Sequence, residues 1–521
     1  MRDTARESFG HDALLPAQAD AIAALLSGQD VLLVAPTGAG KSLVYQVAGL
    51  LIDGPTLVIS PLLALQQDQI DRIEASSAGV RAARISSAES EGARAEALDA
   101  AAAGEVEFLF LAPEQLANPD VRARVAAIEP SLVAVDEAHC VSTWGHDFRP
   151  DYFRLGDLLL EVGEPRVVAM TATAAPPVRE DIVVRLGLRE PRTIVAGFER
   201  ENIALDVVRH ATTGDQEQAV LDAAAQAEGK GIVYCRTRPA AERYAEELAA
   251  RGRRTAVYHA GLGHRRRSSA HEAFMADEVD VMAATSAFGM GIDKPDIRWI
   301  LHAQVPESLD TYYQEVGRAG RDGAPATATL FFRSEDLSLG RFFSAGVPKA
   351  ADVERVARAV EEVGTDPRAV AERSGLGRRK AGRILNLLEL VRQAQVDPDA
   401  DPVAGAVALA ESHRSLERSR VDMMRAYAET DRCRSEFLVG YFGEQVEERC
   451  GRCDNCRAGT VPETRPAHAT YAIQGRVRHD TFGTGVVTDI EEDRVTVLFD
   501  DVGYRTLSLE LAEEGLLSPL D

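Results

Sequence analysis

The stretch that decides the fold is Val31-Leu32-Leu33-Val34-Ala35-Pro36-Thr37-Gly38-Ala39-Gly40-Lys41-Ser42, an apolar strand followed by a glycine-containing loop and a helical pattern. Backbone N–H groups of such a loop, at a helix N-terminus, cradle phosphates. Lys41 would reach the β- and γ-phosphates, and Ser42 would bind Mg²⁺. The other residues expected to line the phosphates are Thr37, Gly38 and Gly40. Ala35 replaces the first glycine of the usual pattern, and a glycine-rich turn without function is the alternative.

Apolar strands alternate with helical stretches from about residue 9 to 335, in two consecutive series. The expected strands are Val31–Ala35, Thr56–Ser60, Phe108–Ala112, Leu132–Val135 and Val167–Thr171, then Ile232–Cys235, Thr255–Tyr258, Val279–Ala283, Trp299–His302 and Thr327–Phe332. Fully apolar strands separated by helices indicate parallel sheets covered on both faces. The sequence therefore predicts an α/β protein with two parallel-sheet domains that join near residues 195–210.

The composition narrows the class of protein. The 521 residues include 58 Lys+Arg against 82 Asp+Glu, a net charge of −24, with 45% hydrophobic and 27% charged residues. This mix excludes a disordered, fibrous or disulfide-scaffold protein. No apolar run is long enough to span a membrane, and the charged segment Met1 to Gly10 is no signal peptide, so we expect a cytoplasmic location. Any contact with nucleic acid must come from local patches on an acidic body.

Two carboxylates follow the strand Leu132–Val135, in Asp136-Glu137-Ala138-His139. A carboxylate at a strand's C-terminal edge can hold Mg²⁺ through water, and the next can orient or deprotonate the attacking water. A solvated turn is the alternative, and the phosphate loop upstream favours the catalytic interpretation.

Two arginines stand out in the second series, in Gln314-Glu315-Val316-Gly317-Arg318-Ala319-Gly320-Arg321-Asp322-Gly323. If the segment is helical, Arg318 and Arg321 lie on one face. Arginine suits a γ-phosphate because its planar fork donates two hydrogen bonds and keeps its charge. Arginines that face a phosphate loop on another domain would make hydrolysis depend on domain closure. Surface salt bridges are the alternative.

These motifs, in this order, resemble the RecQ family of superfamily-2 DNA helicases from Phe9 to about Cys456. The segments that carry the resemblance further are Phe9-Gly10 with Pro16-Ala17-Gln18, Ser60-Pro61-Leu62-Leu63-Ala64-Leu65, Met170-Thr171-Ala172-Thr173-Ala174, and Ala284 to Pro295. The resemblance implies two RecA-like domains with ATP between them. It implies that Gln18 reads adenine, that Asp293 also contacts the nucleotide, and that His139 and Gln314 serve catalysis. Leu15 and His11 depart from the family pattern around the adenine, which puts strict adenine selectivity in doubt.

The most family-specific stretch runs from Ser142 to Tyr152 and contains Trp144, His146, Phe148 and Arg149. In the family this aromatic loop senses single-stranded DNA. An aromatic face stacks on any base, and an arginine can reach a phosphate. A core cluster of Trp144, Phe148 and Tyr152 is the alternative. Ser60 and His259 are the further DNA contacts that the resemblance implies, the latter between basic clusters that could equally be solvated faces.

Four of the six cysteines, Cys433, Cys450, Cys453 and Cys456, lie close together in sequence, which in a reducing compartment indicates metal ligation. Their spacing and the neighbouring Tyr441-Phe442-Gly443 match the family's zinc module. Four thiolates suit a closed tetrahedral Zn²⁺ site, and an iron–sulfur cluster is the weaker alternative.

Residues 350–396 interrupt the family pattern. Asp366 to Leu376 resembles a first helix and a glycine-containing turn, and Gly377 to Arg383 opens a second helix with a basic start. This resembles a helix-turn-helix, with or without a wing, in which Arg378 and Arg379 would contact DNA. A helical spacer is the alternative. The winged helix that usually follows the zinc module is not found.

The last fifty residues, rich in valine and glycine, predict a small β-barrel that resembles the Tudor- or SH3-like tail of UvrD/PcrA-type helicases. Such tails dock on RNA polymerase or other partners, here a polymerase or a repair factor; a stability cap is the alternative. We expect five parts, 1–200, 201–340, 341–400, 401–460 and 461–521.

The expected activity is ATP-dependent 3′-to-5′ DNA unwinding by a monomer, with ATP, Mg²⁺ and structural Zn²⁺. A translocase that unwinds little duplex, a DNA- and polymerase-binding regulator, and an RNA helicase are the alternatives.

Overall fold

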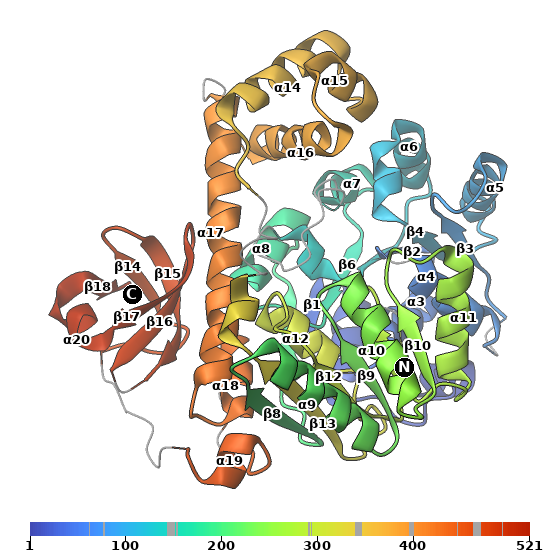
Figure 1. The fold of residues 1–521 in the computed structure, drawn as a ribbon. Helices are drawn as coiled ribbons and strands as arrows, with labels where there is room; N and C mark the ends of the chain where they lie inside the picture. The colour runs from blue at the N-terminus through green and yellow to red at the C-terminus, as the bar shows by residue number, and fades with distance from the viewer. Residues whose placement is uncertain are drawn as a thin grey trace. The chain divides into compact units, whose positions relative to one another are not determined.

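A computed structural model describes residues 1–61, 63–76, 79–142, 152, 155–289, 292, 294–338, 346–394, 401–444, 446, 448–461, 470–491 and 493–520. The chain divides into two compact units (Figure 1). The first unit is Met1–Asp336 with Met424–Thr464, and the second is Leu337–Met423 with Arg465–Asp521. No helix among these described residues is long and apolar enough to cross a membrane.

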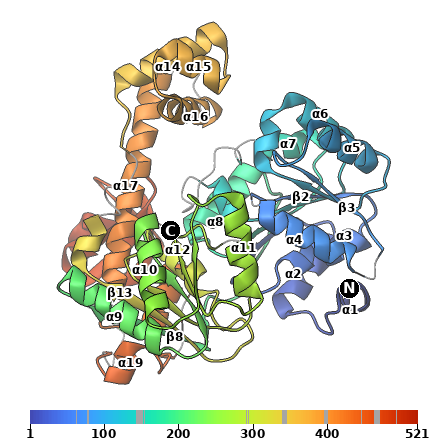
Figure 2. The ribbon, with the colours of Figure 1, turned by 45° about the vertical axis from the view of Figure 1, so that its right-hand side comes forward.

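The first unit begins with a seven-stranded parallel sheet in the order β3-β4-β2-β5-β6-β1-β7. Its strands are β1 (Val31–Val34), β2 (Thr56–Ile59), β3 (Ala82–Ile85), β4 (Phe108–Leu111), β5 (Leu132–Val135), β6 (Arg166–Thr171) and β7 (Arg192–Val195). Its helices are α1 (Arg2–Phe9), α2 (Pro16–Leu26), α3 (Ser42–Leu51), α4 (Leu63–Glu74), α5 (Glu91–Ala102), α6 (Pro119–Ala127), α7 (Leu155–Glu161) and α8 (Pro176–Leu186), with short 3₁₀ turns at Pro113–Ala117 and Ala138–Val141. Figure 2 shows α2, α3 and α4 on one side of the strands and α5, α6 and α7 on the other. The central strands are buried on both faces, which explains their unbroken apolar sequence.

A six-stranded parallel sheet follows, in the order β10-β11-β9-β12-β13-β8. Its strands are β8 (Ile203–Arg209), β9 (Lys230–Tyr234), β10 (Thr255–Tyr258), β11 (Val281–Ala284), β12 (Ile297–His302) and β13 (Ala326–Phe332). Its helices are α9 (Thr213–Gln226), α10 (Arg238–Ala250), α11 (His264–Met275) and α12 (Leu309–Val316), with a short 3₁₀ turn at Ser334–Asp336. The predicted fold of two parallel-sheet domains is confirmed.

Helices dominate the next part of the chain. They are α14 (Ala350–Val363), α15 (Pro367–Ser374), α16 (Arg378–Ala394), α17 (Pro402–Glu429), α18 (Arg434–Tyr441) and α19 (Asp454–Ala458). Helix α15 ends at Gly375, whose φ of 67° gives the left-handed turn before α16. The predicted helix-turn-helix therefore forms. Between residues 346 and 394, all of them described, the structure contains helices and no strand, so no wing forms within this range.

The C-terminal β domain is a five-stranded antiparallel sheet in the order β17-β16-β15-β14-β18. Its elements are β14 (Arg476–His479), β15 (Gly483–Ile490), β16 (Arg494–Phe499), β17 (Gly503–Ser508), α20 (Leu509–Leu511), a further turn at Ala512–Leu516, and β18 (Leu517–Pro519). The loop before β17 packs on α17 within the second unit. Ser412 Oγ donates to Asp501 O at 2.8 Å, and Ser415 Oγ donates to Val502 O at 3.0 Å.

Candidate functional site

The phosphate loop joins β1 to α3. Gly38 and Gly40 adopt φ angles of 86° and 65°, which side chains with a Cβ rarely adopt. Lys41 Nζ donates to the carbonyl oxygens of Ala35 and Pro36, at 3.0 and 3.3 Å. Burial lowers the pKa of Lys41, although the carboxylates of Glu137 and Asp136 act in the opposite direction. The carbonyl oxygens of the loop thus bind the ammonium group of Lys41. Phosphate oxygens would replace these carbonyl contacts when nucleotide binds.

Gln18 supports this loop directly. Its Nε2 donates to Ala39 O at 3.0 Å and to Gly40 O at 3.1 Å, and its Oε1 accepts from Leu15 N at 2.8 Å. A Cβ on Gly40 would lie 2.7 Å from Gln18 Nε2, so the glycine is needed for this approach. The side chain that the family resemblance assigns to adenine therefore also couples the start of α2 to the phosphate loop. His11 and Leu15, the two departures from the family pattern, are exposed.

The acidic pair follows β5 and faces the phosphate loop. Asp136 Oδ2 accepts from Ser60 Oγ at 3.3 Å, and its Oδ1 accepts from Glu137 N at 3.0 Å. Burial, followed by the charge of Glu137, raises the pKa of Asp136 to about 6. A carboxylate that is costly to keep charged in the absence of a cation is suited to bind one. Asp136 and Ser42 are therefore the residues that would hold Mg²⁺.

A run of polar contacts leads from Glu137 toward the second domain. His139 Nδ1 lies 3.3 Å from Glu137 Oε2 and 2.9 Å from Thr171 Oγ1. Thr171 donates its hydroxyl hydrogen to Thr173 O at 3.0 Å, so His139 Nδ1 is the donor in its contact with Thr171. Gln314 Nε2 then donates to Thr173 Oγ1 at 3.3 Å. These polar contacts link the Glu137 carboxylate, next to the phosphate loop, to α12 of the second domain.

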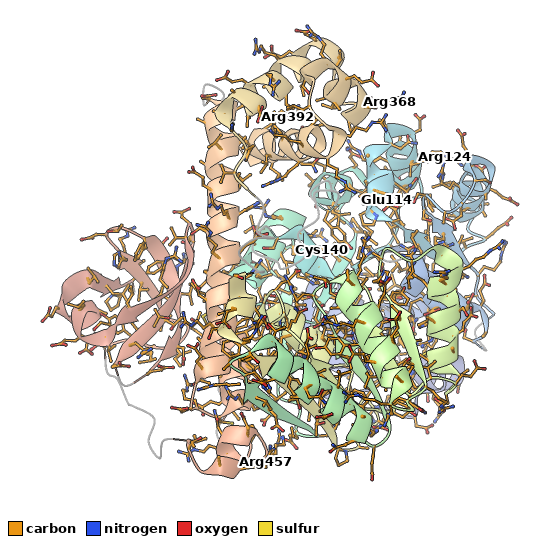
Figure 3. The ribbon with its side chains drawn as sticks, in the orientation of Figure 1. Glu114, Arg124, Cys140, Arg368, Arg392 and Arg457 are labelled. Carbon is orange, nitrogen blue, oxygen red and sulfur yellow. The ribbon has the colours of Figure 1, made fainter. Side chains whose placement is uncertain are left out.

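The protonation of His139 suits this position. Burial lowers its pKa, but Cys140, labelled in Figure 3, and Glu137 raise it by more, so the net pKa stands well above the ordinary value. A cationic imidazole would hold the Glu137 carboxylate in place.

The two predicted arginines have different surroundings. Helix α12 ends at Val316, so Arg318 and Arg321 lie in the following turn and not on one helical face, as we had considered. Arg318 is buried within the second domain, where a Cβ on Gly289 would lie 2.9 Å from its Nη2. The Arg321 side chain runs beside the phosphate loop, where a Cβ on Gly38 would lie 3.4 Å from its Cγ. The positive charge of Arg321 also contributes to the lowered pKa of Lys41.

Sequence reasoning missed the two residues that brace this arginine turn. Arg200 donates to Gly317 O at 3.1 Å, to Ala319 O at 3.0 Å and to Gly320 O at 3.3 Å. Asn202 Nδ2 donates to Gly320 O at 2.7 Å and to Ala324 O at 2.9 Å. Both lie where the two domains join, and only their polar character in a linker segment could have drawn attention to them.

The residues that we expected to contact DNA lie in different surroundings in the structure. Trp144, His146, Phe148 and Arg149 lie outside the described residues, as does Asp293. Tyr152, the end of the same stretch, is fully buried and donates to Asp136 O at 3.1 Å. Ser60 binds Asp136, as described above. His259 is buried, and its Nε2 lies 3.1 Å from Glu242 Oε1, so its ring holds the local fold. Arg378 and Arg379 are exposed at the start of α16.

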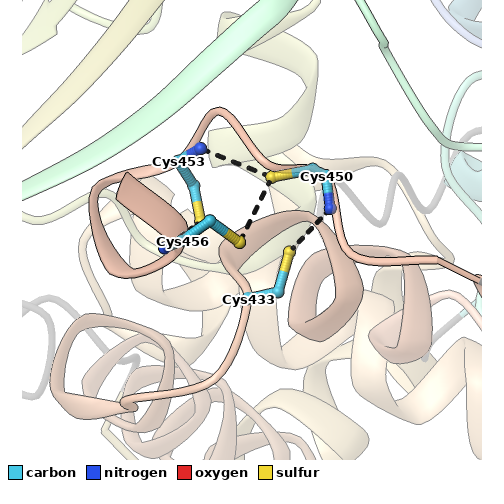
Figure 4. Close-up of side chains that lie close together, drawn as sticks. All are labelled: Cys433, Cys450, Cys453 and Cys456. Atoms are coloured by element: carbon cyan, nitrogen blue, oxygen red, sulfur yellow. Dashed lines mark hydrogen bonds between the residues drawn. The ribbon is translucent and has the colours of Figure 1, made fainter. Parts of the chain in front are cut away.

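The four clustered cysteines form a metal site (Figure 4). Their Sγ atoms all lie within 4.8 Å of one another, and those of Cys450 and Cys456 are 4.0 Å apart. Zn–S bonds of about 2.3 Å place tetrahedral sulfur atoms about 3.8 Å apart, so the set fits one Zn²⁺ ion. Backbone N–H groups approach the sulfur atoms at 3.4–3.5 Å, from Arg434, Cys450, Cys453 and Cys456. Such bonds stabilise thiolates, and the ion is structural because all four ligands are protein sulfurs.

The zinc module packs on the segment that joins the two domains. Phe442 stacks on Phe198 with ring centroids 4.5 Å apart, and Arg452 pairs with Glu199 at 3.1 Å. Asp454 Oδ2 accepts from Val207 N of edge strand β8 at 3.1 Å. The metal therefore stabilises the region from which Arg200 and Asn202 reach the arginine turn.

A parallel sheet that carries a phosphate loop, facing a second sheet that supplies an arginine, defines a two-domain nucleotide-driven motor. The profile described as "DEAD/DEAH box helicase" matches residues 15–182, "Helicase conserved C-terminal domain" matches residues 215–323, and "RecQ zinc-binding" matches residues 390–457.

Two relatives from Bacillus subtilis are each 34% identical to this chain over 88% of its length. They are the ATP-dependent DNA helicase RecQ, of which the match covers 66%, and the probable ATP-dependent DNA helicase RecS, of which it covers 92%. The chain belongs to the RecQ family of ATP-dependent DNA helicases. Among solved structures, the DUF1998 helicase MrfA bound to DNA shares the fold, with a TM-score of 0.55 and 16% identity over 80% of this chain and 64% of that one.

Proposed function

We propose that this protein is an ATP-driven motor that moves 3′ to 5′ along single-stranded DNA and unwinds tailed or forked duplexes in repair or recombination. The observation that supports this most is the approach of Arg321 to Gly38, together with the hydrogen bond from Gln314 to Thr173. Both link the second domain to the nucleotide side of the first. Family membership supports DNA as the substrate.

The proposed roles follow from the geometry. Lys41 and the backbone of Thr37, Gly38 and Gly40 bind phosphates, while Ser42 and Asp136 hold Mg²⁺, which supplies charge neutralisation at the transferred phosphoryl group. Glu137 orients the attacking water, and His139 holds Glu137 in place.

Arg321 stabilises negative charge from across the domain interface. Arg318 positions the turn that carries it, because its side chain is buried inside the second domain. Gln18 and Asp293 complete the nucleotide contacts. Arg200 braces this turn, and the zinc module packs on the segment that carries Arg200, so both would couple domain closure to hydrolysis.

DNA contacts in this proposal come from Trp144, His146, Phe148 and Arg149. Ser60 and His259, which the family resemblance also assigns to DNA, are buried, so in this proposal they support the track without contacting the bases. Stacking on aromatic rings tolerates any base, which a translocating motor needs. Ser60 donates to Asp136, the residue proposed to hold Mg²⁺.

The test compares ATP hydrolysis with and without single-stranded DNA, and unwinding of 3′-tailed and 5′-tailed duplexes. We expect DNA-stimulated hydrolysis and unwinding of the 3′-tailed duplex only. Hydrolysis that DNA does not stimulate would refute the motor, and unwinding from a 5′ tail would refute the direction.

A second candidate is a translocase that displaces bound proteins and separates little duplex. It is favoured by the C-terminal β domain, because residues 470–491 and 493–520 form a sheet where a strand-separating winged helix is usual. Streptavidin displacement from biotinylated DNA, without unwinding of the same tailed substrate, would favour this candidate.

We further propose that the chain acts as a monomer on the cytoplasmic nucleoid, where its DNA substrate lies, and that its C-terminal β domain docks on RNA polymerase or a repair factor. Pull-down with and without residues 470–520 tests the docking, and sedimentation tests the monomer. Loss of the partner only when the domain is absent is the expected result.

A further inference from the structure

The first half of α16 presents a polar face that no described residue of the protein covers. Arg379, Gly382, Arg383 and Asn386 follow one another at the spacing of a single helical face, and the side chains of Arg379, Arg383 and Asn386 are exposed. The opposite face is apolar and buried, with Ala381 and Ile384 packed inside the bundle of α14, α15 and α16. The apolar side of α16 therefore anchors the helix in the bundle, while the polar face lies outside the packed core.

Its charge differs from that of the rest of the molecule. Residues 378–388 contain four cations and no acid, in a chain of net charge −24. Arg378, Arg379 and Arg383 make no hydrogen bond or ion pair with any residue that the structure describes. Most other cations of α14, α15 and α16 are paired with a carboxylate, namely Arg355, Arg368, Arg373, Lys380 and Arg392, of which Arg368 and Arg392 are labelled in Figure 3. Unpaired arginines on one helix face of an acidic protein are complementary to a polyanion.

Gly382 adds an independent observation. Glycine in the middle of a helix destabilises that helix relative to alanine. Nothing in the described part of the chain requires it, because a Cβ at Gly382 would have no atom within 4 Å. A helix face that carries a gap between two arginines can approach a flat partner closely.

We infer that this face of α16 binds the major groove of duplex DNA, as a site separate from the single-strand track of the motor. Helix α16 is the second helix of the helix-turn-helix and carries these residues in its N-terminal half, the part that reaches base edges in such motifs. Arginine and asparagine are the side chains that form paired hydrogen bonds with guanine and adenine edges. Arg378, at the first turn, lies where a phosphate also meets the helix dipole. The inference takes only DNA as the ligand from the proposed function.

Binding of the full-length protein to a blunt duplex of about 20 base pairs, without nucleotide, tests the site by fluorescence anisotropy. The triple variant Arg379→Ala, Arg383→Ala and Asn386→Ala should lose at least about tenfold in duplex affinity. Its affinity for oligo(dT) of equal length should change by less than about twofold. Arg392→Ala is the matched control, since it removes one charge from the C-terminal end of the same helix, where the arginine is paired with Glu389.

A second variant separates shape from charge. Gly382→Leu leaves every arginine in place and improves helix propensity, so thermal stability should hold or rise. Its bulk should nevertheless reduce duplex affinity as strongly as the triple variant does. The inference would be overturned if the variants lost equal affinity for the duplex and for oligo(dT), or if either variant kept its duplex affinity. It would also be overturned if the variants lost only their binding to an acidic protein. Stimulation of ATP hydrolysis by oligo(dT) in the parent chain is scored separately, so failure of the motor and failure of this site are distinguishable.

Discussion

Replacement of Asp136 by asparagine should stabilise the nucleotide-free protein while it abolishes ATP hydrolysis. The carboxylate is half-buried at the end of β5, and its loss of solvent together with the charge of Glu137 raises its pKa to about 6. Asparagine removes the charge but keeps an acceptor for Glu137 N, and its amide can donate to Ser60 Oγ, so the local hydrogen bonds survive. Under the proposed function, hydrolysis should be lost because the carboxylate that would hold Mg²⁺ is removed.

The expected gain in the free energy of unfolding follows from the raised pKa of Asp136. A shift from the ordinary 3.8 to about 6 corresponds to about 3 kcal/mol of native-state destabilisation. Because the folded carboxyl holds its proton more tightly than the unfolded one, stability falls as pH rises from about 4 to 6, and the full cost is present above that window. The variant should therefore be more stable by up to about 3 kcal/mol near pH 7.5, and by about half of this near pH 5.

Calorimetric unfolding without nucleotide, over this pH range, measures the effect, with an upward shift of several degrees expected near neutrality. Asp30→Asn is the matched control, because Asp30 is a buried carboxylate of the same sheet that accepts from Val167 N at 2.9 Å and from Arg189 N at 2.8 Å. An amide cannot replace both acceptor oxygens, so this variant should lose about 1–3 kcal/mol. A destabilised Asp136→Asn protein, or a gain that does not depend on pH, would refute the reasoning.

Three further changes test other parts of the structure. Arg321→Ala should lower kcat for ATP by about 10³-fold or more while ATP binding changes little, because the guanidinium acts on charge that develops beside Gly38; a loss below about tenfold contradicts this role. Cys453→Ser should reduce bound zinc, measured by atomic absorption, from one ion per chain to none and lower the unfolding temperature; retained zinc contradicts the four-thiolate site. Gly503→Val should weaken the docking of the C-terminal β domain on α17 by about 1–3 kcal/mol, because Gly503 has a φ of 75° and its added Cβ would overlap Ser419 Oγ. Limited proteolysis should then release the C-terminal fragment faster, and an unchanged rate would show that this contact does not hold the domain.

The strands that the sequence predicted are mostly those in the interior of the two sheets. β1, β2, β4 and β5 are buried along their whole length, so their sequences are unbroken apolar runs. Strands β3, β7 and β8 were not predicted, and all three lie at sheet edges, where alternate residues face outward and polar side chains break the pattern. An edge strand is therefore identified by the strand with which it pairs in the sheet more than by the pattern of its own residues.

In the candidate site, too, the features that are local in sequence were predicted and the contacts between distant residues were not. The phosphate loop, the acidic pair and the cysteine cluster were found because their chemistry is carried by residues close together in sequence. The separate surroundings of Arg318 and Arg321 could not be found in this way, because α12 ends before them and Arg200 holds the turn from more than a hundred residues away.

The sequence by itself determined the two parallel sheets, the phosphate loop at Lys41, the four zinc ligands and the helix-turn-helix, since each depends on local spacing and apolar periodicity. Only the tertiary structure decided which arginine lies beside the phosphate loop, that Gln18 braces that loop, and that His139 and Thr173 link Glu137 to Gln314. Those contacts join residues distant in sequence, and burial and hydrogen-bond geometry, which no local pattern contains, select among their possible partners.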